Sequence, residues 1–242
     1  MTVGASIAAP VERVDYHDLR PEFLDRHRQG DHIAVIGPTG HGKTTVAIDL
    51  LEGLVAKNGA YAAILANKRR DPVLRRLGWP IIPNWPARGG PSYEIRTGRR
   101  VIVWPPYGQA STTQTRNRGI FEHALDQIID EGSWSVYFDE IIYFTEQLGL
   151  RRQLDEYWNT ARSSNVTVLG SSQGTTWIPR AFVTQQSWLV AFRPKTRDGR
   201  RALADIGGDR ARYEPALERL AKHEFLIVNT QTDEAYISRY KP

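Results

Sequence analysis

The sequence predicts an α/β fold: one mostly parallel sheet with helices on both faces and a β-hairpin at the C-terminus. Short apolar runs alternate with helical segments through most of the chain, which is the rhythm of βαβ units. Several of the runs are apolar almost throughout, as strands are when helices cover both faces of a sheet. The final stretch, 224–240, contains two strand-like runs around a polar turn, which predicts the hairpin.

The element boundaries follow from this alternation. We expect strands over 32–37, 60–66, 100–104, 135–139, 166–172 and 188–193, and helices over 43–57, 117–131, 149–163 and 214–222. The stretch 77–91 is rich in Pro and Gly and too long for a simple turn, so we expect an exposed functional or connecting loop. We divide the chain into an N-terminal extension, 1–28, and one α/β domain, 29–242.

Composition excludes several classes of protein. Hydrophobic residues make up 40% of the 242 residues, enough for a packed core. The chain has no run of about 18 apolar residues, so we expect no membrane insertion. The first residues lack the basic start and apolar core of a secretory signal, so a cytoplasmic protein is expected, in the host cytoplasm if the protein is viral. Zero cysteines exclude disulfides and thiolate metal sites.

One short motif predicts a phosphate-binding loop. The stretch GPTGHGKT matches G-x-x-x-x-G-K-[ST], with an apolar strand before it and a helical run after it. Glycines let the backbone turn its N–H groups toward phosphates, and the helix N-terminus adds partial positive charge. Lys43 is expected to reach the β- and γ-phosphates of ATP, and the Thr44 hydroxyl to bind Mg²⁺. The predicted nucleotide-binding residues are Gly37, Pro38, Thr39, Gly40, His41, Gly42, Lys43, Thr44 and Thr45.

A pair of acidic residues indicates the type of reaction. Asp139 and Glu140 end the apolar run SVYFDE, and the chain before it has room for two strands after the phosphate loop. Asp139 is expected to hold Mg²⁺ through water, and Glu140 to orient or deprotonate an attacking water. Such a pair can also simply begin a helix. With the phosphate loop upstream, the pair favours hydrolysis over kinase chemistry.

A GTPase fits the sequence poorly. GTPases carry D-x-x-G at this place, whereas the third residue after Asp139 is Ile142. The stretch NKRRD superficially suggests the guanine-reading N-K-x-D, but it is one residue too long and follows the second strand. We therefore interpret Asn67 and Lys68 as part of a basic loop.

Gln173 ends a further buried strand, NVTVLGSSQ. A carboxamide at that place can contact both the γ-phosphate and the attacking water, and so respond to whether the phosphate is present. The alternative is a polar residue that caps a turn at the end of a strand.

Together these stretches resemble the HerA/FtsK superfamily of DNA-translocating ATPases. The resemblance rests on GPTGHGKTT, VYFDE and ARSSNVTVLGSSQG followed by IPRAF, and covers about residues 30 to 240. Within the superfamily the chain looks most like the compact packaging ATPases of small viruses and phages. The resemblance implies a RecA-like (ASCE) P-loop NTPase fold and a homo-oligomeric ring, hexameric or pentameric, with ATP at subunit interfaces and DNA in the pore.

The same resemblance suggests an arginine that acts on a neighbouring subunit. Arg162 matches the position before the glutamine strand where these ATPases often place a trans-acting arginine, which would offset charge on the γ-phosphate. Arg180 is the second choice, and Arg151 or Arg152 the third. Each of them can also be an ordinary solvated side chain.

Basic clusters indicate where DNA would bind. The net charge of +5 is modest support for a polyanionic partner, but Arg and Lys come in bursts. A motor must grip phosphates, because a moving contact cannot depend on base identity. The preferred contacts follow the second strand: Lys68, Arg69, Arg70, Arg75 and Arg76. Arg116 and Arg118 are the alternative, and either cluster can also be an ordinary solvated face.

Trp79, Trp85 and Trp104 can stack on bases or pack a loop.

The sequence as a whole favours an ATP-driven translocase of double-stranded DNA, acting as a viral genome-packaging motor that docks on a capsid portal or vertex protein. A conjugation, plasmid-transfer or filamentous-phage secretion ATPase is the alternative within the superfamily. From another class, an ATP-dependent switch or adaptor that does not translocate also stays open. A small-molecule kinase is a further alternative, against which Glu140 argues.

Overall fold

The chain folds around one twisted sheet. The computed structural model describes residues 10–85, 100–108 and 110–241. Ten strands in the described part form the sheet in the order β1-β10-β9-β8-β2-β7-β6-β3-β5-β4. They are β1 (Glu12–Arg13), β2 (His32–Ile36), β3 (Tyr61–Leu65), β4 (Ile81–Ile82), β5 (Arg100–Val103), β6 (Trp134–Phe138), β7 (Thr167–Ser172), β8 (Gln186–Phe192), β9 (Glu224–Asn229) and β10 (Ala235–Arg239). The neighbours from β8 to β4 pair in parallel, whereas β9 is antiparallel to β8 and β10.

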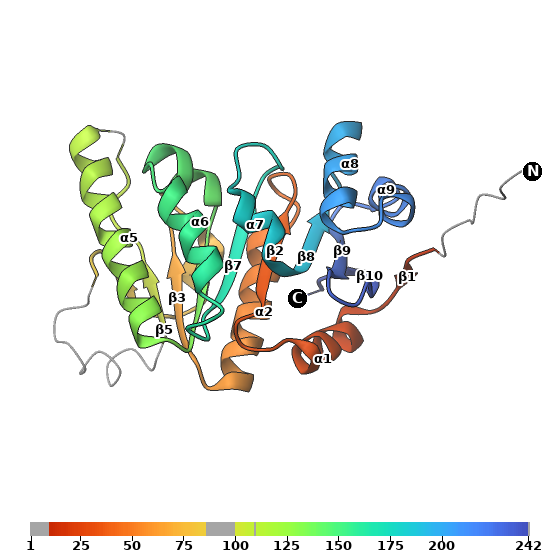
Figure 1. Cartoon of the computed structure of the whole chain (residues 1–242), viewed down its shortest axis with the longest axis horizontal. Coiled ribbons are helices and arrows are strands. Elements are labelled where there is room, and N and C mark those ends of the chain that lie inside the picture. Colours follow the sequence, from red (N-terminus) through yellow and green to blue (C-terminus); the bar gives the residue numbers. More distant parts are fainter. Residues whose placement is uncertain (1–9, 86–99, 109, 242) are drawn as a thin grey trace, which may run out of the picture.

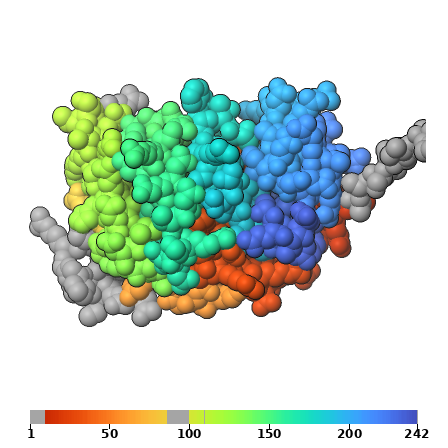
Figure 2. All heavy atoms as spheres, viewed as in Figure 1, coloured from red at the N-terminus to blue at the C-terminus, as the bar shows by residue number. Residues whose placement is uncertain are grey.

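Helices cover both faces of this sheet (Figure 1). One face carries α1 (Tyr16–Arg26), α2 (Lys43–Asn58) and α3 (Pro72–Arg76). The other carries α5 (Ser111–Glu131), the π-helical segment η2 (Tyr143–Gln147), α6 (Arg151–Thr160), α7 (Arg180–Thr184), α8 (Arg197–Ile206) and α9 (Arg210–Glu218). Figure 2 shows this second face as a continuous surface from the green α5 and α6 to the blue C-terminal third.

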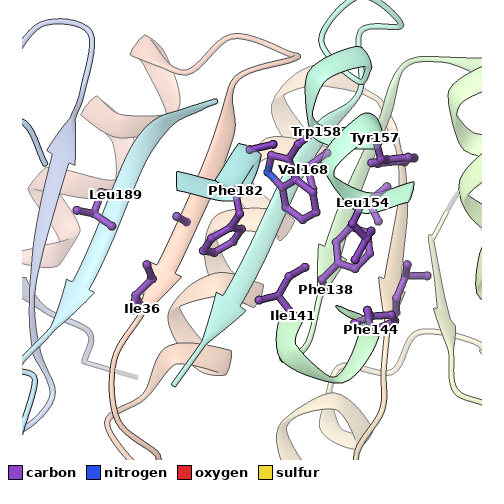
Figure 3. Packing of buried hydrophobic residues seen from close by; sticks show 14 of the residues in the cluster. Ile36, Phe138, Ile141, Phe144, Leu154, Tyr157, Trp158, Val168, Phe182 and Leu189 are labelled. Atoms are coloured by element: carbon purple, nitrogen blue, oxygen red, sulfur yellow. The ribbon is translucent and has the colours of Figure 1, made fainter. Parts of the chain in front are cut away.

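The strands are apolar because both of their faces are buried. In β2, Ile33 and Val35 pack toward α1 and α2, while Ala34 and Ile36 pack toward α6 and α7. Aromatic side chains dominate the core between the sheet and the helices α6 and α7. The Trp158 ring lies 5.2 Å from that of Phe138 and 5.5 Å from that of Phe182 (Figure 3). Burying one such side chain stabilises the fold by roughly 1.5–3 kcal/mol.

One glycine makes this packing possible. A Cβ at Gly170 in β7 would lie only 2.4 Å from the Phe182 ring. The Phe182 ring can therefore rest on β7 only because residue 170 has no side chain. This contact lets α7 pack closely over the centre of the sheet.

The predicted strands and the C-terminal hairpin are confirmed, and the helices differ mainly at their ends. α5 begins at Ser111 rather than 117, so Asn117 lies inside the helix, where it is buried and donates to the Pro106 carbonyl. α9 spans Arg210–Glu218 rather than 214–222, since Asp209 caps its start by accepting from the Arg212 amide. The short helices α1, α3, α7 and α8 were not predicted, because α3 and α7 have only five residues each and α1 and α8 are mostly polar.

The described part of the predicted N-terminal extension, residues 10–28, packs on the rest of the chain. β1 pairs with β10, with Glu12 opposite Tyr236. In α1, the Tyr16 hydroxyl and the Arg20 guanidinium both lie 2.6 Å from Asp49 of α2. Residues 10–28 therefore form an edge strand and a helix of the same folded body.

The stretch expected to be a loop, 77–91, differs from that expectation where it is described. β4 pairs with β5 at the sheet edge, and Trp79 and Trp85 are buried. The Trp85 indole donates to the Gln127 carboxamide over 2.9 Å. Residues 86–91 lie outside the described part. Among the described helices, none is both long and apolar enough to span a bilayer.

His32 supplies a test of the packing at the start of β2. Its Nδ1 accepts from the Val168 amide and its Nε2 lies 3.2 Å from the Trp158 carbonyl, a pattern that only the neutral ring satisfies. Burial lowers the pKa of His32 to about 4. The unfolded chain binds the proton near pH 6.5, whereas the folded chain binds it only near pH 4. The contribution of His32 to the unfolding free energy is therefore fully present above about pH 6.5 and decreases as the pH falls toward 4.

We expect wild-type chain to lose about 2 kcal/mol more unfolding free energy than His32→Gln between pH 7.5 and pH 4.5. Urea denaturation of both chains at the two pH values measures the difference. Equal losses would show that His32 is not held neutral.

Candidate active site

The polar residues of interest share one edge of the sheet because of the strand order. β2, β7, β6 and β3 are neighbours and run in parallel. Their carboxyl ends therefore meet at the same edge. The segments that follow these strands carry Lys43, Gln173, Asp139 and Lys68, respectively. Residues from four distant parts of the chain are brought together in this way.

The loop after β2 has the conformation of a phosphate cradle. Gly40 and Gly42 adopt φ values of 78° and 102°, a left-handed region that favours glycine. Gly42 has no side chain to cap α2, so the helix presents its first amide groups and its positive end to the loop. The Lys43 ammonium is buried and donates to the Pro38 carbonyl over 3.1 Å. Burial lowers the pKa of Lys43.

Asp139 is a buried carboxylate at the end of β6. Its exposed fraction is 1%. Its Oδ1 accepts from the Lys68 ammonium at 2.8 Å and from the Tyr137 hydroxyl at 3.4 Å. Its Oδ2 is buried and has no hydrogen-bond partner among the described residues. Burial raises the pKa of Asp139, and the Lys68 charge opposes that rise.

Glu140 has an unusual backbone, with φ of 75° in a residue that is not glycine. Its amide donates to the Ser171 hydroxyl over 3.0 Å, which ties this conformation to the end of β7. Within the described part of the chain its buried Oε1 finds no hydrogen-bond partner. Burial raises the pKa of Glu140, while Gln173 and Lys43 oppose the rise. The side chain is thus held among groups from the other strand ends.

Gln173 joins the end of β7 to the phosphate loop. Its Oε1 accepts from the Thr39 hydroxyl over 2.9 Å. A cavity of about 500 Å³ opens beside this contact. Its lining includes Pro38, Thr39, Gln173, Thr175, Lys195 and Asp198. The cavity leaves room for a bound group next to the Gln173 carboxamide.

These groups fit a magnesium nucleotide. Mg²⁺ is usually held by one or two carboxylates or hydroxyls together with phosphates and waters. Thr44 Oγ1 and Asp139 Oδ1 both lie within 3.4 Å of one point, the Lys68 nitrogen, so a single cation can reach both. The unpartnered Asp139 Oδ2 offers a further acceptor for a water of that cation. The uncapped start of α2 and Lys43 suit the phosphates.

The comparisons with known proteins concern the fold. No protein-family profile matches the chain, and no curated protein matches it in sequence. Among solved structures, B204, the DNA-packaging ATPase from Sulfolobus turreted icosahedral virus, matches with a TM-score of 0.64 and 14% identity over 89% of this chain and 99% of its own. VirB4 of Thermoanaerobacter pseudethanolicus matches with a TM-score of 0.66 and 11% identity, covering 87% and 89% of the two chains.

The chain has the RecA-like P-loop ATPase fold. A further match is the pCW3 conjugation coupling protein TcpA with ATPγS, at a TM-score of 0.53 and 13% identity, over 86% of this chain and 59% of that one. These likenesses confirm the predicted resemblance to HerA/FtsK-type ATPases at the level of the fold.

The strand order places Lys68 in the candidate nucleotide site, whereas the sequence analysis placed it among the residues that contact DNA. The Lys68 ammonium lies 2.8 Å from Asp139, 3.1 Å from Asp71 and 3.4 Å from Thr44. Burial lowers the pKa of Lys68, but Asp139 and Asp71 outweigh it, so the pKa is raised. Its expected contact with DNA is therefore not supported by its position, because the charge is already neutralised inside the site.

The other basic residues of this segment are more accessible. Arg69 and Arg70 are exposed after β3. Asp71 caps α3 by accepting from two of its amides, and α3 carries Arg75 and Arg76. The Arg75 guanidinium lies over the Trp104 ring, 5.4 Å from its centre. Trp104 thus packs against the basic segment, and its indole donates to the Lys68 carbonyl. That these arginines contact DNA stays a prediction.

Arg162 lies at the other edge of the sheet, before β7 begins. Its guanidinium donates to the Ser187 hydroxyl over 2.7 Å and lies 3.4 Å from both Asp31 and the Gly30 carbonyl. Asp31 precedes β2, whereas the phosphate loop follows β2. Arg162 cannot reach the site of its own chain. A role in a neighbouring site stays a prediction, and it would require Arg162 to exchange these partners for a phosphate.

The alternative arginines differ in their surroundings. Arg151 is bound to Glu146 and donates to the Trp177 carbonyl over 3.0 Å, in the loop that follows Gln173. Arg152 and Arg180 are exposed. Arg151 therefore lies at the edge that carries the candidate nucleotide site, and the choice among the four arginines stays open.

Three residues of the site were not predicted from the sequence: Asp71, Tyr137 and Ser171. The Tyr137 hydroxyl links Asp139 to Ser171, over 3.4 Å and 3.2 Å. Burial raises the pKa of Tyr137 well above its ordinary value, so it stays a donor. A signal was present, because polar residues inside otherwise apolar buried strands need partners.

Arg162 gives a test of the observed contacts. We expect Arg162→Ala to lower the unfolding free energy by about 1 kcal/mol, because it removes the bond to Ser187 and leaves Asp31 without this cation. Arg152→Ala, a change at an exposed arginine of α6, is expected to stay within about 0.5 kcal/mol of wild type. Urea denaturation measures both. An Arg162→Ala chain as stable as wild type would contradict this arrangement.

Proposed function

We propose that the chain is an Mg²⁺-dependent ATP hydrolase that moves double-stranded DNA. The observation that carries the proposal is the convergence of Lys43, Asp139, Glu140 and Gln173 at one sheet edge, from the ends of β2, β6 and β7. A phosphate-binding lysine, a metal-binding carboxylate, a second carboxylate and a carboxamide are together the set that hydrolysis of a nucleoside triphosphate needs.

Each residue has its own part in this proposal. The amides of the phosphate loop and the Lys43 ammonium hold the β- and γ-phosphates, while Thr44 and Asp139 hold Mg²⁺. When bound, Mg²⁺ neutralises charge on the transferred phosphate. Glu140, kept partly buried beside Gln173, orients a water and accepts its proton. Gln173, bound to Thr39 of the loop, positions that water against the γ-phosphate.

Two features support DNA as the partner. The exposed arginines of the segment 69–76 offer phosphate contacts that do not depend on sequence. The structural neighbour B204 is described as a DNA-packaging ATPase. On this basis we propose a viral genome-packaging motor that works as a homo-oligomeric ring on a capsid portal or vertex protein. An arginine of one subunit, one of the four candidates above, completes the site of the next.

The likeness to VirB4 and to the coupling protein TcpA favours a second candidate, an ATPase of conjugative transfer. Both candidates use the same site and the same DNA contacts. They differ in the docking partner, so co-purification with a portal protein or with a conjugation relaxase distinguishes them. An ATP-dependent switch that does not translocate would hydrolyse ATP at a rate indifferent to DNA.

The direct test is ATP turnover with and without duplex DNA at low salt. We expect DNA to raise the rate, and Arg70→Gln to weaken the apparent DNA affinity by removing one phosphate contact, which corresponds to a salt slope lower by about 1. Arg28→Gln removes the same charge at the other sheet edge and is expected to behave as wild type. Turnover that ignores duplex DNA in the assembled protein would overturn the translocase and leave the switch.

Glu140→Gln separates binding from hydrolysis. The amide keeps the size of the side chain but cannot take a proton from water, so we expect turnover to fall by about 10²–10⁴-fold. ATP affinity, measured by fluorescence of a labelled analogue, is expected to remain within a factor of about three, because the nucleotide is held by other residues. Near-normal hydrolysis would remove Glu140 from its assigned role.

A further inference from the structure

Lys68 reaches the same oxygen atoms that the proposed function gives to the metal ion. Its ammonium lies 3.4 Å from Thr44 Oγ1 and 2.8 Å from Asp139 Oδ1. Two cations cannot occupy this space together, because like charges a few ångströms apart repel strongly where little water screens them. Lys68 and Mg²⁺ are therefore competitors for Asp139.

The charge of Asp139 is costly unless a cation balances it. The side chain is 1% exposed, so its charge is almost cut off from water. A buried carboxylate without a compensating cation is strongly destabilising. Lys68 supplies that cation from within the chain, and no other described Lys, Arg or His forms an ion pair with Asp139.

The Lys68 ammonium has a second acidic partner, Asp71. Asp71 accepts from the same ammonium through Oδ2 at 3.1 Å, while its Oδ1 caps α3. The Lys68 side chain is 40% exposed, which gives it a route toward solvent. Its backbone is held in place, because the Trp104 indole donates to the Lys68 carbonyl. The ammonium can therefore leave Asp139 and stay with Asp71 while the strand end does not move.

We propose that Lys68 is a displaceable counter-ion of Asp139, which excludes a free divalent cation from the site and yields to Mg²⁺ only when nucleotide phosphates enter with it. The phosphates provide the negative charge that makes a second cation favourable. Lys68 is thus a positioning residue that makes metal binding depend on nucleotide. This inference rests on the proposed magnesium nucleotide site.

Metal binding to the full chain tests the inference, with Mn²⁺ as the probe and its free concentration read by electron paramagnetic resonance. In the absence of nucleotide, we expect Lys68→Met to bind Mn²⁺ about tenfold or more tightly than wild type, since the competing charge is gone. Arg28→Met removes a charge of the same sign from an exposed residue at the other sheet edge. We expect it to leave Mn²⁺ affinity unchanged. Equal affinities in Lys68→Met and wild type would overturn the inference.

Stability gives a second readout in the same variant. Without Lys68, Asp139 has lost its cation, so the melting temperature of Lys68→Met is expected to fall below that of wild type and to recover when Mg²⁺ is added. Wild-type chain is expected to respond little to Mg²⁺ alone. If Lys68→Met does not fold, Lys68→Gln, which keeps a hydrogen-bond donor for Asp139 without the charge, is measured in the same two ways.

Wild-type chain provides a test that needs no variant. Amine-reactive labelling, read peptide by peptide, is expected to modify Lys68 faster once Mg²⁺ and ADP are bound. Lys57, whose ammonium donates to carbonyls at the C-terminal end of α1, is the internal control. An unchanged Lys68 rate in chain that has bound Mg²⁺ and ADP would contradict displacement. If the wild-type chain binds no nucleotide, it is the proposed function that fails.

Discussion

The buried carboxylate of Asp139 is the constraint on which the site depends. It lies at the end of β6, away from water, beside one ammonium and one phenol hydroxyl. A charge in such a place has to be matched by another charge. The chain satisfies this need with Lys68, and the proposed reaction satisfies it with Mg²⁺. Nucleotide binding then becomes an exchange of one cation for another around a carboxylate that stays where it is.

The sheet is what gives this exchange its geometry. Because β3, β6, β7 and β2 are adjacent and parallel, the residues that follow them lie along one edge of the sheet. Apolar layers on both sides keep the strand ends in register, and Phe138, the last residue of β6, packs between the rings of Trp158 and Phe144 (Figure 3). The ties from Ser171 to Glu140 and from Thr39 to Gln173 join neighbouring strand ends. A shift of one strand would therefore disturb several groups together.

Much of this arrangement could be predicted from the sequence, and the rest could not for physical reasons. Lys43, Asp139, Glu140 and Gln173 each follow a recognisable apolar run, and parallel strands bring such ends together. The position of Lys68 depends on the pairing of β3 with β6. No local sequence pattern predicts that pairing. Arg162 was placed by resemblance, but its bonds to Asp31 and Ser187 join residues far apart in the chain. The ten-residue α8 was missed because it is mostly polar, with Leu203 and Ala204 as its buried residues.

The measurement that tests the account most directly is the affinity of ADP with and without Mg²⁺, in wild type and in Asp139→Asn, by isothermal titration calorimetry. We expect Mg²⁺ to tighten ADP binding to wild type and to give Asp139→Asn little or no such gain, while metal-free ADP binds both chains through the phosphate loop. An equal gain from Mg²⁺ in the two chains would place the metal elsewhere and contradict the central role of Asp139.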